Sequence, residues 1–325
     1  MDNFLIVSKQ IGQIVFFVLV GIMALKTKLL KETALDSLAK IVIDITMPLT
    51  IFVRLVQETT GDDIIDSLSI LLVALVIDTL LFACAAVTSR LLKLEGDRKN
   101  LFRCMTMFGN CIFIGLPLIT SLFPEKGVLY VSLCNLVDQV LIWTVGVKLT
   151  THVEEKMGLQ KNDFLQEMKQ FVRNITSPAL IGIFLGIIFV LLGIRLPDIV
   201  HSALSSLGNM TTPLSMIYLG AFMCTLNIGS AFKNLHYYIM SFIKLIFVPI
   251  ILFTVMILIG YDANAAFALC MMAGLPTMTS IVMFANLRNS DGEYACGGLT
   301  VITLLSIVTL PILSLVFDRI LMLLI

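Results

Sequence analysis

Ten apolar segments constrain the fold of this chain more than any other feature. We expect helices over residues 8–25, 36–56, 65–92, 100–122, 127–150, 177–194, 199–226, 236–260, 264–286 and 294–322. A helix of roughly 20 apolar residues crosses the hydrocarbon core of a bilayer. Charged residues make up only 14% of the chain, whereas soluble domains carry about 25%. The sequence therefore predicts an all-α polytopic membrane protein with ten transmembrane helices.

A polar linker at residues 152–176 separates the first five expected helices, in residues 1–151, from the second five, in residues 177–325. Five is an odd number, so the second group enters the membrane with the opposite polarity. This is the arrangement of an inverted repeat, which is common in secondary transporters. The sequence thus predicts two inverted five-helix repeats.

Two short patterns occur once in each half and support the repeat. G-L-P-x-x-T-S occurs at 115–121 and again at 274–280, in the fourth and ninth helices. The pattern [DN]-x-T-x-P-L-[TS] occurs at 44–50 and at 209–215, in the second and seventh helices. From it we expect Asp44, Pro48, Asn209 and Pro213 to support a break or bend in those two helices.

The fourth helix carries Gly109, Asn110, Gly115 and Pro117 within nine residues. Glycine weakens a helix, and proline removes a hydrogen-bond donor and clashes with the preceding turn. A simple kink is one interpretation, but the second copy at Pro276 favours two helices broken at mid-membrane. Broken helices are tolerated in lipid where the freed backbone groups face protein or a watery cavity.

Two such breaks favour an anionic substrate, because the start of each second half-helix, expected near Pro117 and Pro276, presents a positive dipole end and unpaired N–H groups. Asn135 and Gln139 share a face of the fifth helix, from which they either reach the break or hydrogen-bond neighbouring helices. The residues predicted to bind substrate are Asn110, Gly115, Pro117, Asn135, Gln139, Pro276, Thr277 and Thr279.

Asp78 in the third helix and Lys244 in the eighth lie at mirrored positions of the two repeats. Charged residues inside membrane helices are expensive and usually functional. The pair is interpreted either as a switchable ion pair or proton site, or as a fixed structural pair that joins two helices.

Other classes of function find little support. The sequence has no His at membrane depth, no metal-ligand cluster, and neither a G-x-S-x-G motif nor a P-loop. We therefore expect no enzyme activity, metal, cofactor or nucleic-acid partner. The seven cysteines form no C-x-x-C pair and are interpreted as packing residues. The first apolar run is expected to be a retained helix.

Lys and Arg in the connections set the orientation. Fifteen lie on the side of the central linker and five on the other, excluding the two inside helices. This bias predicts a cytoplasmic linker and both termini outside, so the sequon at Asn174 would not be glycosylated. The expected location is a plasma membrane, that of a bacterium.

Four motifs, in the same order along the chain, resemble those of the auxin efflux carrier family, which contains the plant PIN-type auxin exporters and bacterial malate and malonate permeases. Residues 110–118 are similar to its N-x-x-x-x-G-[IL]-P-L, and residues 139–144 to its Q-x-x-I-W-Y-T without the Tyr. Residues 213–220 resemble its seventh helix, and residues 275–285 with 310–312 its last two.

The resemblance implies the ten-helix fold of bile-acid and sodium/proton carriers. Helices 1, 2, 6 and 7 would form a scaffold, and helices 3–5 and 8–10 a transport domain in which helices 4 and 9 cross at Asn110, Pro117 and Pro276. The short linker and the missing Tyr favour a bacterial carboxylate carrier over an auxin exporter. The resemblance leaves open a coupled proton or sodium ion and a homodimer. The alternatives are a cation/proton antiporter of related fold and a non-transporting membrane receptor.

Overall fold

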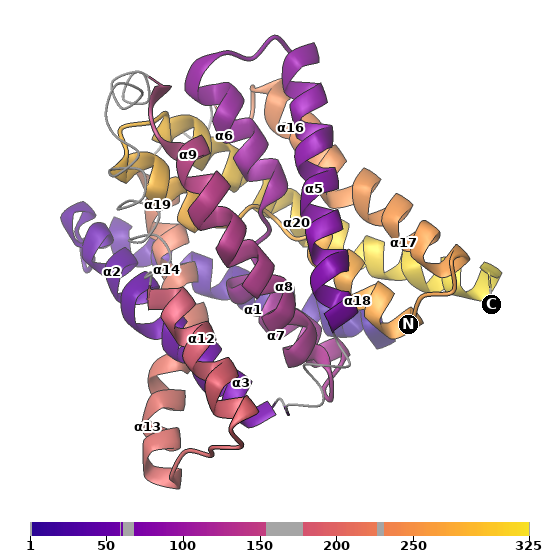
Figure 1. Cartoon of the computed structure of the whole chain (residues 1–325). Coiled ribbons are helices and arrows are strands. Elements are labelled where there is room, and N and C mark those ends of the chain that lie inside the picture. The colour runs from indigo at the N-terminus through magenta and orange to yellow at the C-terminus, as the bar shows by residue number, and fades with distance from the viewer. Residues whose placement is uncertain (1, 59, 61–67, 154–177, 226–230, 325) are drawn as a thin grey trace, which may run out of the picture.

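The computed structural model of this protein describes residues 2–58, 60, 68–153, 178–225 and 231–324, and every regular element within them is a helix (Figure 1). Most of the expected linker, including Asn174, lies outside the described residues. The all-α prediction is confirmed for the described part of the chain.

Before the linker, the helices follow the expected segments closely. They are α1 (Asp2–Lys26), η1 (Glu32–Ala34), α2 (Leu35–Ile41), η2 (Val42–Thr46), α3 (Met47–Glu58), α5 (Leu68–Leu91), α6 (Gly96–Met107), η3 (Cys111–Gly115), α7 (Leu116–Leu122), α8 (Gly127–Leu141), η4 (Ile142–Gly146) and α9 (Val147–Thr150).

After the linker, the correspondence is equally close. The helices are α12 (Pro178–Leu191), α13 (Asp198–Asn209), α14 (Thr211–Cys224), α16 (Leu235–Phe242), η5 (Ile243–Phe247), α17 (Val248–Leu258), α18 (Ala263–Ala273), α19 (Ser280–Leu287) and α20 (Gly292–Leu324).

In the described part of the chain, five helical spans are long and apolar enough to cross a membrane. They are Phe4–Lys26, Leu68–Leu91, Leu129–Thr150, Leu235–Leu258 and Gly292–Leu323. Their outer faces carry exposed apolar side chains, such as Leu72 and Leu258, each 67% exposed. Large exposed apolar surfaces are rare on soluble proteins and suit contact with lipid. The membrane location is therefore supported, while the ten-helix inverted repeat stays a prediction.

Three prolines inside helices each follow a wide π-helical turn. The turns η2, η3 and η5 end two residues before Pro48, Pro117 and Pro249. In each case the residue before the proline donates its N–H to a carbonyl five residues back, as Leu116 does to Cys111. A proline cannot donate to the carbonyl one turn earlier and clashes with it. The wider turn lets the helix continue past the proline.

Helices α1 and α14 cross so closely that their backbones nearly touch. A Cβ atom built on Gly21 would lie 2.1 Å from the carbonyl oxygen of Ile217, and one on Gly220 would lie 2.0 Å from that of Val18. Small residues allow membrane helices to approach in this way. The crossing joins the first helix of the chain to a helix from beyond the linker.

This contact predicts a strong effect of one added methyl group. We expect Gly21→Ala to lower the free energy of unfolding by about 1–3 kcal/mol, because α1 must move away from α14. Gly12→Ala is the matched control, since Gly12 lies in the same helix and no atom of the described residues comes within 4 Å of its added Cβ. Thermal melting of the two purified variants measures the difference. Equal melting temperatures would show that α1 and α14 do not cross at Gly21.

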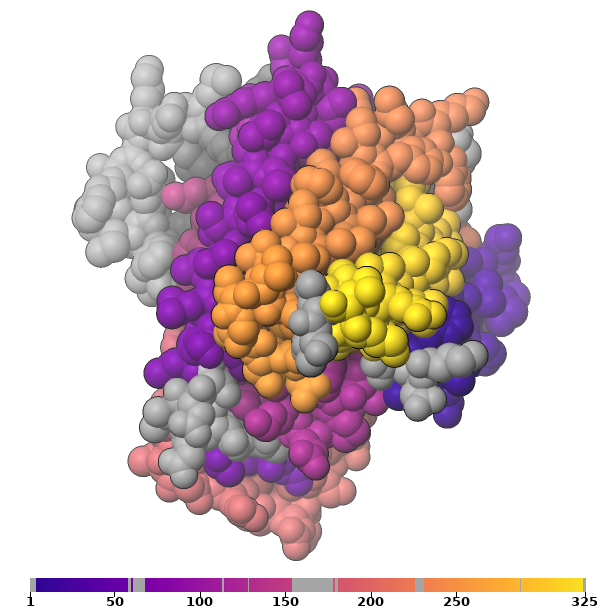
Figure 2. Space-filling model, turned by 90° about the vertical axis from the view of Figure 1, so that its right-hand side faces the viewer, coloured from indigo at the N-terminus to yellow at the C-terminus, as the bar shows by residue number. Residues whose placement is uncertain are grey.

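An aromatic cluster holds three helices of the second half together. The rings of Phe253 in α17 and Phe317 in α20 stack with centroids 4.1 Å apart, and Phe267 in α18 meets both edge-on. All three side chains are buried. Figure 2 shows these helices from outside, in orange and yellow, side by side on one face of the molecule. The cluster therefore packs α17, α18 and α20 against one another.

Candidate substrate and ion site

The two broken helices meet as a short antiparallel pair of extended segments. Gly109, between α6 and η3, lies opposite Thr277, between α18 and α19. The Asn110 N–H donates to the carbonyl oxygen of Pro276 over 2.8 Å, and the Met278 N–H donates to that of Phe108 over 3.2 Å. Backbone groups freed by the two breaks thus satisfy one another, as burial in a membrane protein requires.

Asn110 connects the two half-helices at this crossing. Its carbonyl oxygen accepts the N–H groups of Ile114 and Gly115, which starts the second half of the broken helix. Its side-chain amide Nδ2 donates across the crossing to the Thr279 hydroxyl over 3.1 Å. Asn110 is 2% exposed and Thr279 is fully buried. The predicted residues Asn110, Pro276, Thr277 and Thr279 are therefore brought together.

Pro117 lies away from the break, which corrects the expectation that the second half-helix starts near it. The extended segment covers Phe108 to Asn110, and η3 begins at Cys111. The wide turn η3 absorbs the missing N–H of Pro117, so the helix does not have to end there. Gly115 lies within this turn, and a Cβ on it would come 2.6 Å from Leu275 Cδ1. Gly115 therefore permits the close approach of the second broken helix.

The carbonyl end of α6 is occupied by side chains of the second half. The Lys244 ammonium, in η5, donates to the carbonyl oxygens of Thr106 over 2.7 Å and Met107 over 3.4 Å. The Thr277 hydroxyl donates to that of Met105 over 2.7 Å. A cation is favourable at the negative end of a helix dipole. Lys244 is fully buried, so it holds the first half-helix in place at the break.

A small cavity of about 20 Å³ lies beside the crossing. Three charged side chains line it: Asp78 of α5, Asp138 of α8 and Lys244. Its volume is enough for about one water molecule. The mirrored residues Asp78 and Lys244 therefore share one cavity. Asp138 was not among the predicted site residues, although a charged residue in the middle of an apolar helix is the signal that would have found it.

Asp138 is tied directly to the broken helix. The thiol of Cys111, the first residue of η3, donates to Asp138 Oδ2 over 2.9 Å. Asp138 is 5% exposed and Cys111 is 4% exposed. The start of the second half-helix is thus held to the carboxylate that lines the cavity.

Asn135 and Gln139 are buried in α8 and contact each other. The Gln139 amide donates to Asn135 Oδ1 over 3.4 Å. Neither residue lines the cavity. The residues of α8 that do line it are Cys134 and Asp138. The Asn135 amide nitrogen is buried without a hydrogen-bond partner among the described residues.

The second shared pattern forms a contact between its own two copies. The Thr50 hydroxyl, in α3, lies 2.7 Å from the Thr211 hydroxyl, in α14, and donates to the carbonyl oxygen of Gly208 over 2.7 Å. Pro48 follows η2, and Pro213 lies in the first turn of α14, after the boundary between α13 and α14. Asp44 and Asn209 are exposed, so neither contributes to the buried crossing.

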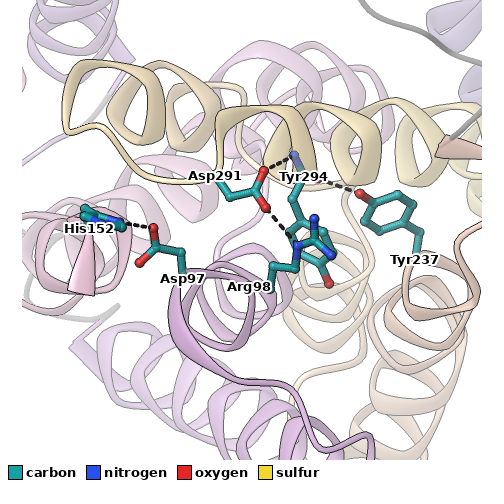
Figure 3. Close-up of polar contacts among 6 residues, drawn as sticks. All are labelled: Asp97, Arg98, His152, Tyr237, Asp291 and Tyr294. Atoms are coloured by element: carbon teal, nitrogen blue, oxygen red, sulfur yellow. Dashed lines mark hydrogen bonds and ion pairs between the residues drawn. The ribbon is translucent and has the colours of Figure 1, made fainter. Parts of the chain in front are cut away.

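A separate polar cluster lies at the start of α6 (Figure 3). Asp97 contacts the His152 ring and accepts the Val153 N–H over 2.9 Å. Arg98 Nε donates to Asp291 Oδ2 over 2.8 Å, and this hydrogen bond raises the pKa of Arg98.

Asp291 also caps α20, because its Oδ1 accepts the Tyr294 N–H over 2.9 Å. The Tyr237 hydroxyl donates to the Tyr294 carbonyl oxygen over 3.0 Å. The cluster therefore joins both sides of the linker at one end of the helices.

Comparison with known proteins gives two findings. The family model described as "Membrane transport protein" matches residues 6–314. An archaeal protein from Methanocaldococcus jannaschii, described as "Uncharacterized transporter MJ1031", is 28% identical over 212 residues, which are 64% of this chain and 66% of the relative. The aligned part is thus just under two thirds of the relative's length. The family match covers nearly the whole chain, and the chain belongs to this membrane transport family, that of the auxin efflux carriers.

Proposed function

We propose that this protein is a secondary active transporter that moves a small organic anion through the helix crossing by alternating access. A carboxylate or dicarboxylate, such as malate or malonate, or an auxin-like acid, would be the substrate. The main observation in support is the buried pairing of two broken helices, which the Asn110 amide bridges. Unwound segments at the bilayer midplane are where secondary transporters bind their substrates.

The donors at the crossing support an anionic substrate. The first N–H groups of a helix have no carbonyl one turn earlier to bond, and here η3 starts at Cys111 beside Asn110. The positive end of the helix dipole lies at the start of η3, next to Asn110, whose amide is a further donor at the crossing. The carbonyl end of α6 holds Lys244 instead. A carboxylate fits the donors, and it would replace Thr279 as the acceptor of the Asn110 amide.

The present conformation supports alternating access. Asn110 and Thr279 are buried, and the cavity beside them holds about one water. A carboxylate therefore needs the packed helices to separate before it can enter. Opening to the two sides of the membrane in turn would give transport without a continuous pore.

Three contacts support the ten-helix inverted repeat. Matching helices of the two halves meet in space: the second and seventh through Thr50 and Thr211, the fourth and ninth through segments 109–110 and 276–277, and the third and eighth through Asp78 and Lys244 around the cavity. Corresponding helices approach each other near the axis of a two-fold repeat. This is the expected outcome of opposite insertion of two five-helix units.

Packing also supports the division into a scaffold and a transport domain. Among the scaffold helices, α1 packs along α14, and α3 packs against α12 and α13. Among the transport helices, α5 packs against α6 and α8, and α17 against α18. Figure 1 shows α3, α12 and α13 grouped at one side of the molecule, away from α5, α16 and α17.

The charge bias predicts that the start of α6 lies in the cytoplasm of a bacterial cell and that both termini lie outside. Glu95 and Glu125 are exposed residues at opposite ends of the broken helix formed by α6 and α7. We expect a membrane-impermeant maleimide to label Glu125→Cys, and not Glu95→Cys, in intact cells, with the wild-type protein as the baseline. Labelling of Glu95→Cys alone would reverse the orientation.

A cation/proton antiporter is the second candidate, and the two acids and one lysine in the cavity favour it. Uptake into proteoliposomes that contain the full chain separates the candidates. We expect saturable uptake of labelled malonate or malate, or of an indole carboxylate, above the level of protein-free liposomes. Cation/proton exchange that needs no organic anion would favour the antiporter. Absence of any flux would favour a receptor.

A further inference from the structure

We propose that Asp78 and Asp138 together form the coupling-ion site of the transporter, and that the pair holds one exchangeable proton. The proposal deepens the transport function proposed above and rests on it. It concerns a carboxyl pair built from two helices, α5 and α8, around the cavity beside the crossing.

The charges around the cavity do not balance. Asp78 and Asp138 supply two negative charges, and Lys244 supplies one positive charge. The exposed fractions of these residues are 5%, 5% and 0%. An unbalanced charge in a membrane interior is expensive, so the site must take up one monovalent cation.

Three observations locate that cation between the carboxyl groups. Asp78 and Asp138 line the same cavity, which has room for only about one water molecule. Asp78 Oδ2 is buried with no hydrogen-bond partner among the described residues. Lys244 directs its hydrogen bonds to the carbonyl oxygens of Thr106 and Met107. The Asp78 carboxyl therefore has an open position, which a proton on one acid of the pair would fill with a carboxyl–carboxylate hydrogen bond.

The lining favours a proton over a sodium ion. Hard metal cations need several oxygen ligands. Apart from the two carboxylates, the lining consists of Lys244, the thiols of Cys111 and Cys134, and apolar side chains and backbone. Among the described residues, the thiol of Cys104 also faces Lys244, and the thiol of Cys270 faces that of Cys134. A proton needs only the two carboxyl groups.

Cys111 would link the proton to the substrate. It donates to Asp138 Oδ2, and it is the neighbour of Asn110 at the crossing. When the pair takes a proton from one side of the membrane, Asp138 holds Cys111 differently, and the start of η3 shifts. When the pair gives the proton up on the other side, the shift reverses. One proton enters and one proton leaves, so charge and atoms balance.

Infrared spectroscopy of the full-length protein tests the pair without any substrate. The probe is the proton itself, through the carbonyl stretch of a protonated carboxyl group in a titration from acid to alkaline pH. We expect a signal equivalent to one buried carboxyl group at neutral pH in the wild type, lost in Asp138→Asn and in Asp78→Asn. Asp36→Asn is the matched control, since Asp36 is exposed in α2. A wild type without this signal would overturn the proposal.

Thermal unfolding gives a second, independent readout. A proton that the folded pair holds and the unfolded chain releases makes stability fall as pH rises, by up to tenfold in the folding equilibrium constant per pH unit. This fall starts above about pH 4, where exposed Asp residues ionise, and it stops where the pair loses its proton. Either Asn variant should lack that component. Stabilisation of the wild type by Na⁺ at fixed pH, absent in the variants, would instead assign the site to sodium.

Failure of this proposal differs from failure of the proposed function. If the wild type transports an anion and Asp138→Asn retains uptake driven by a pH gradient, the protein transports without this proton site. If no anion is transported but the infrared signal is present and depends on both acids, the proton site stands and the substrate assignment fails.

Discussion

Lys244→Met should lower the free energy of unfolding of the protein by about 3–5 kcal/mol at neutral pH. Removal of one partner from a buried group of charges leaves the rest uncompensated, which typically has an effect of this size. Here it leaves the Asp78–Asp138 pair without the lysine that offsets its negative charge, and it leaves the carbonyl oxygens of Thr106 and Met107 without their donor. Unfolding by SDS in mixed micelles measures the loss.

Two further variants serve as a control and as a test of the interaction between Asp78 and Lys244. Lys40→Met is the matched control, because Lys40 is an exposed lysine in α2, and it should have little effect. Adding Asp78→Asn to Lys244→Met removes the repulsion between two buried acids and leaves a single acid that one proton neutralises, so the double variant should recover part of the stability. Additive losses would show that Asp78 and Lys244 do not interact through the cavity.

The stability loss caused by Lys244→Met should also depend on pH. At low pH the carboxyl groups of the Lys244→Met variant can take up protons, which removes the uncompensated charge at the cost of protonation. The difference in the free energy of unfolding between Lys244→Met and the wild type should therefore become smaller as the pH falls.

The sequence was informative about Asp78 and Lys244 because both signals are local. A charged residue in an apolar helix is conspicuous, and the repeat offset relates the two positions without knowledge of the packing. The structure places both around one cavity. The hydrogen bonds from Lys244 to the carbonyl end of α6 were not predictable in the same way, since they depend on where that helix ends.

The end of α6 itself shows why proline is an ambiguous signal. Pro117 was expected at the break, but a wide π-helical turn carries the helix past it, as another does before Pro48. Pro276, with the same G-L-P pattern, does lie in an extended segment. One sequence pattern thus accompanies two backbone shapes, so the pattern alone does not predict where the helix breaks.

Asp138 shows a second limit of sequence reasoning. Asn135, Asp138 and Gln139 lie within two turns of α8, and periodicity alone does not say which of them faces the broken helix. Only Asp138 lines the cavity, because the rotation of α8 is set by packing against α5 and η3. Asn135 and Gln139 instead contact each other.

Asn110→Ala should weaken binding of the transported anion roughly tenfold to a hundredfold while the fold survives. A hydrogen bond to a charged partner contributes about 1.5–3 kcal/mol, and each 1.4 kcal/mol is a factor of ten in affinity. The backbone pairing of Asn110 with Pro276 does not need the side chain, so the crossing should persist. Binding is measured by thermal shift of the purified protein against a carboxylate that the wild type transports.

Asn264→Ala is the matched control for this result, because Asn264 is exposed in α18, away from the crossing. Its affinity for the anion should equal that of the wild type. Unchanged affinity in Asn110→Ala would place the anion elsewhere. The amide of Asn135, which has no hydrogen-bond partner among the described residues, would then be the next group to test, since a buried donor without a partner is costly unless a ligand satisfies it.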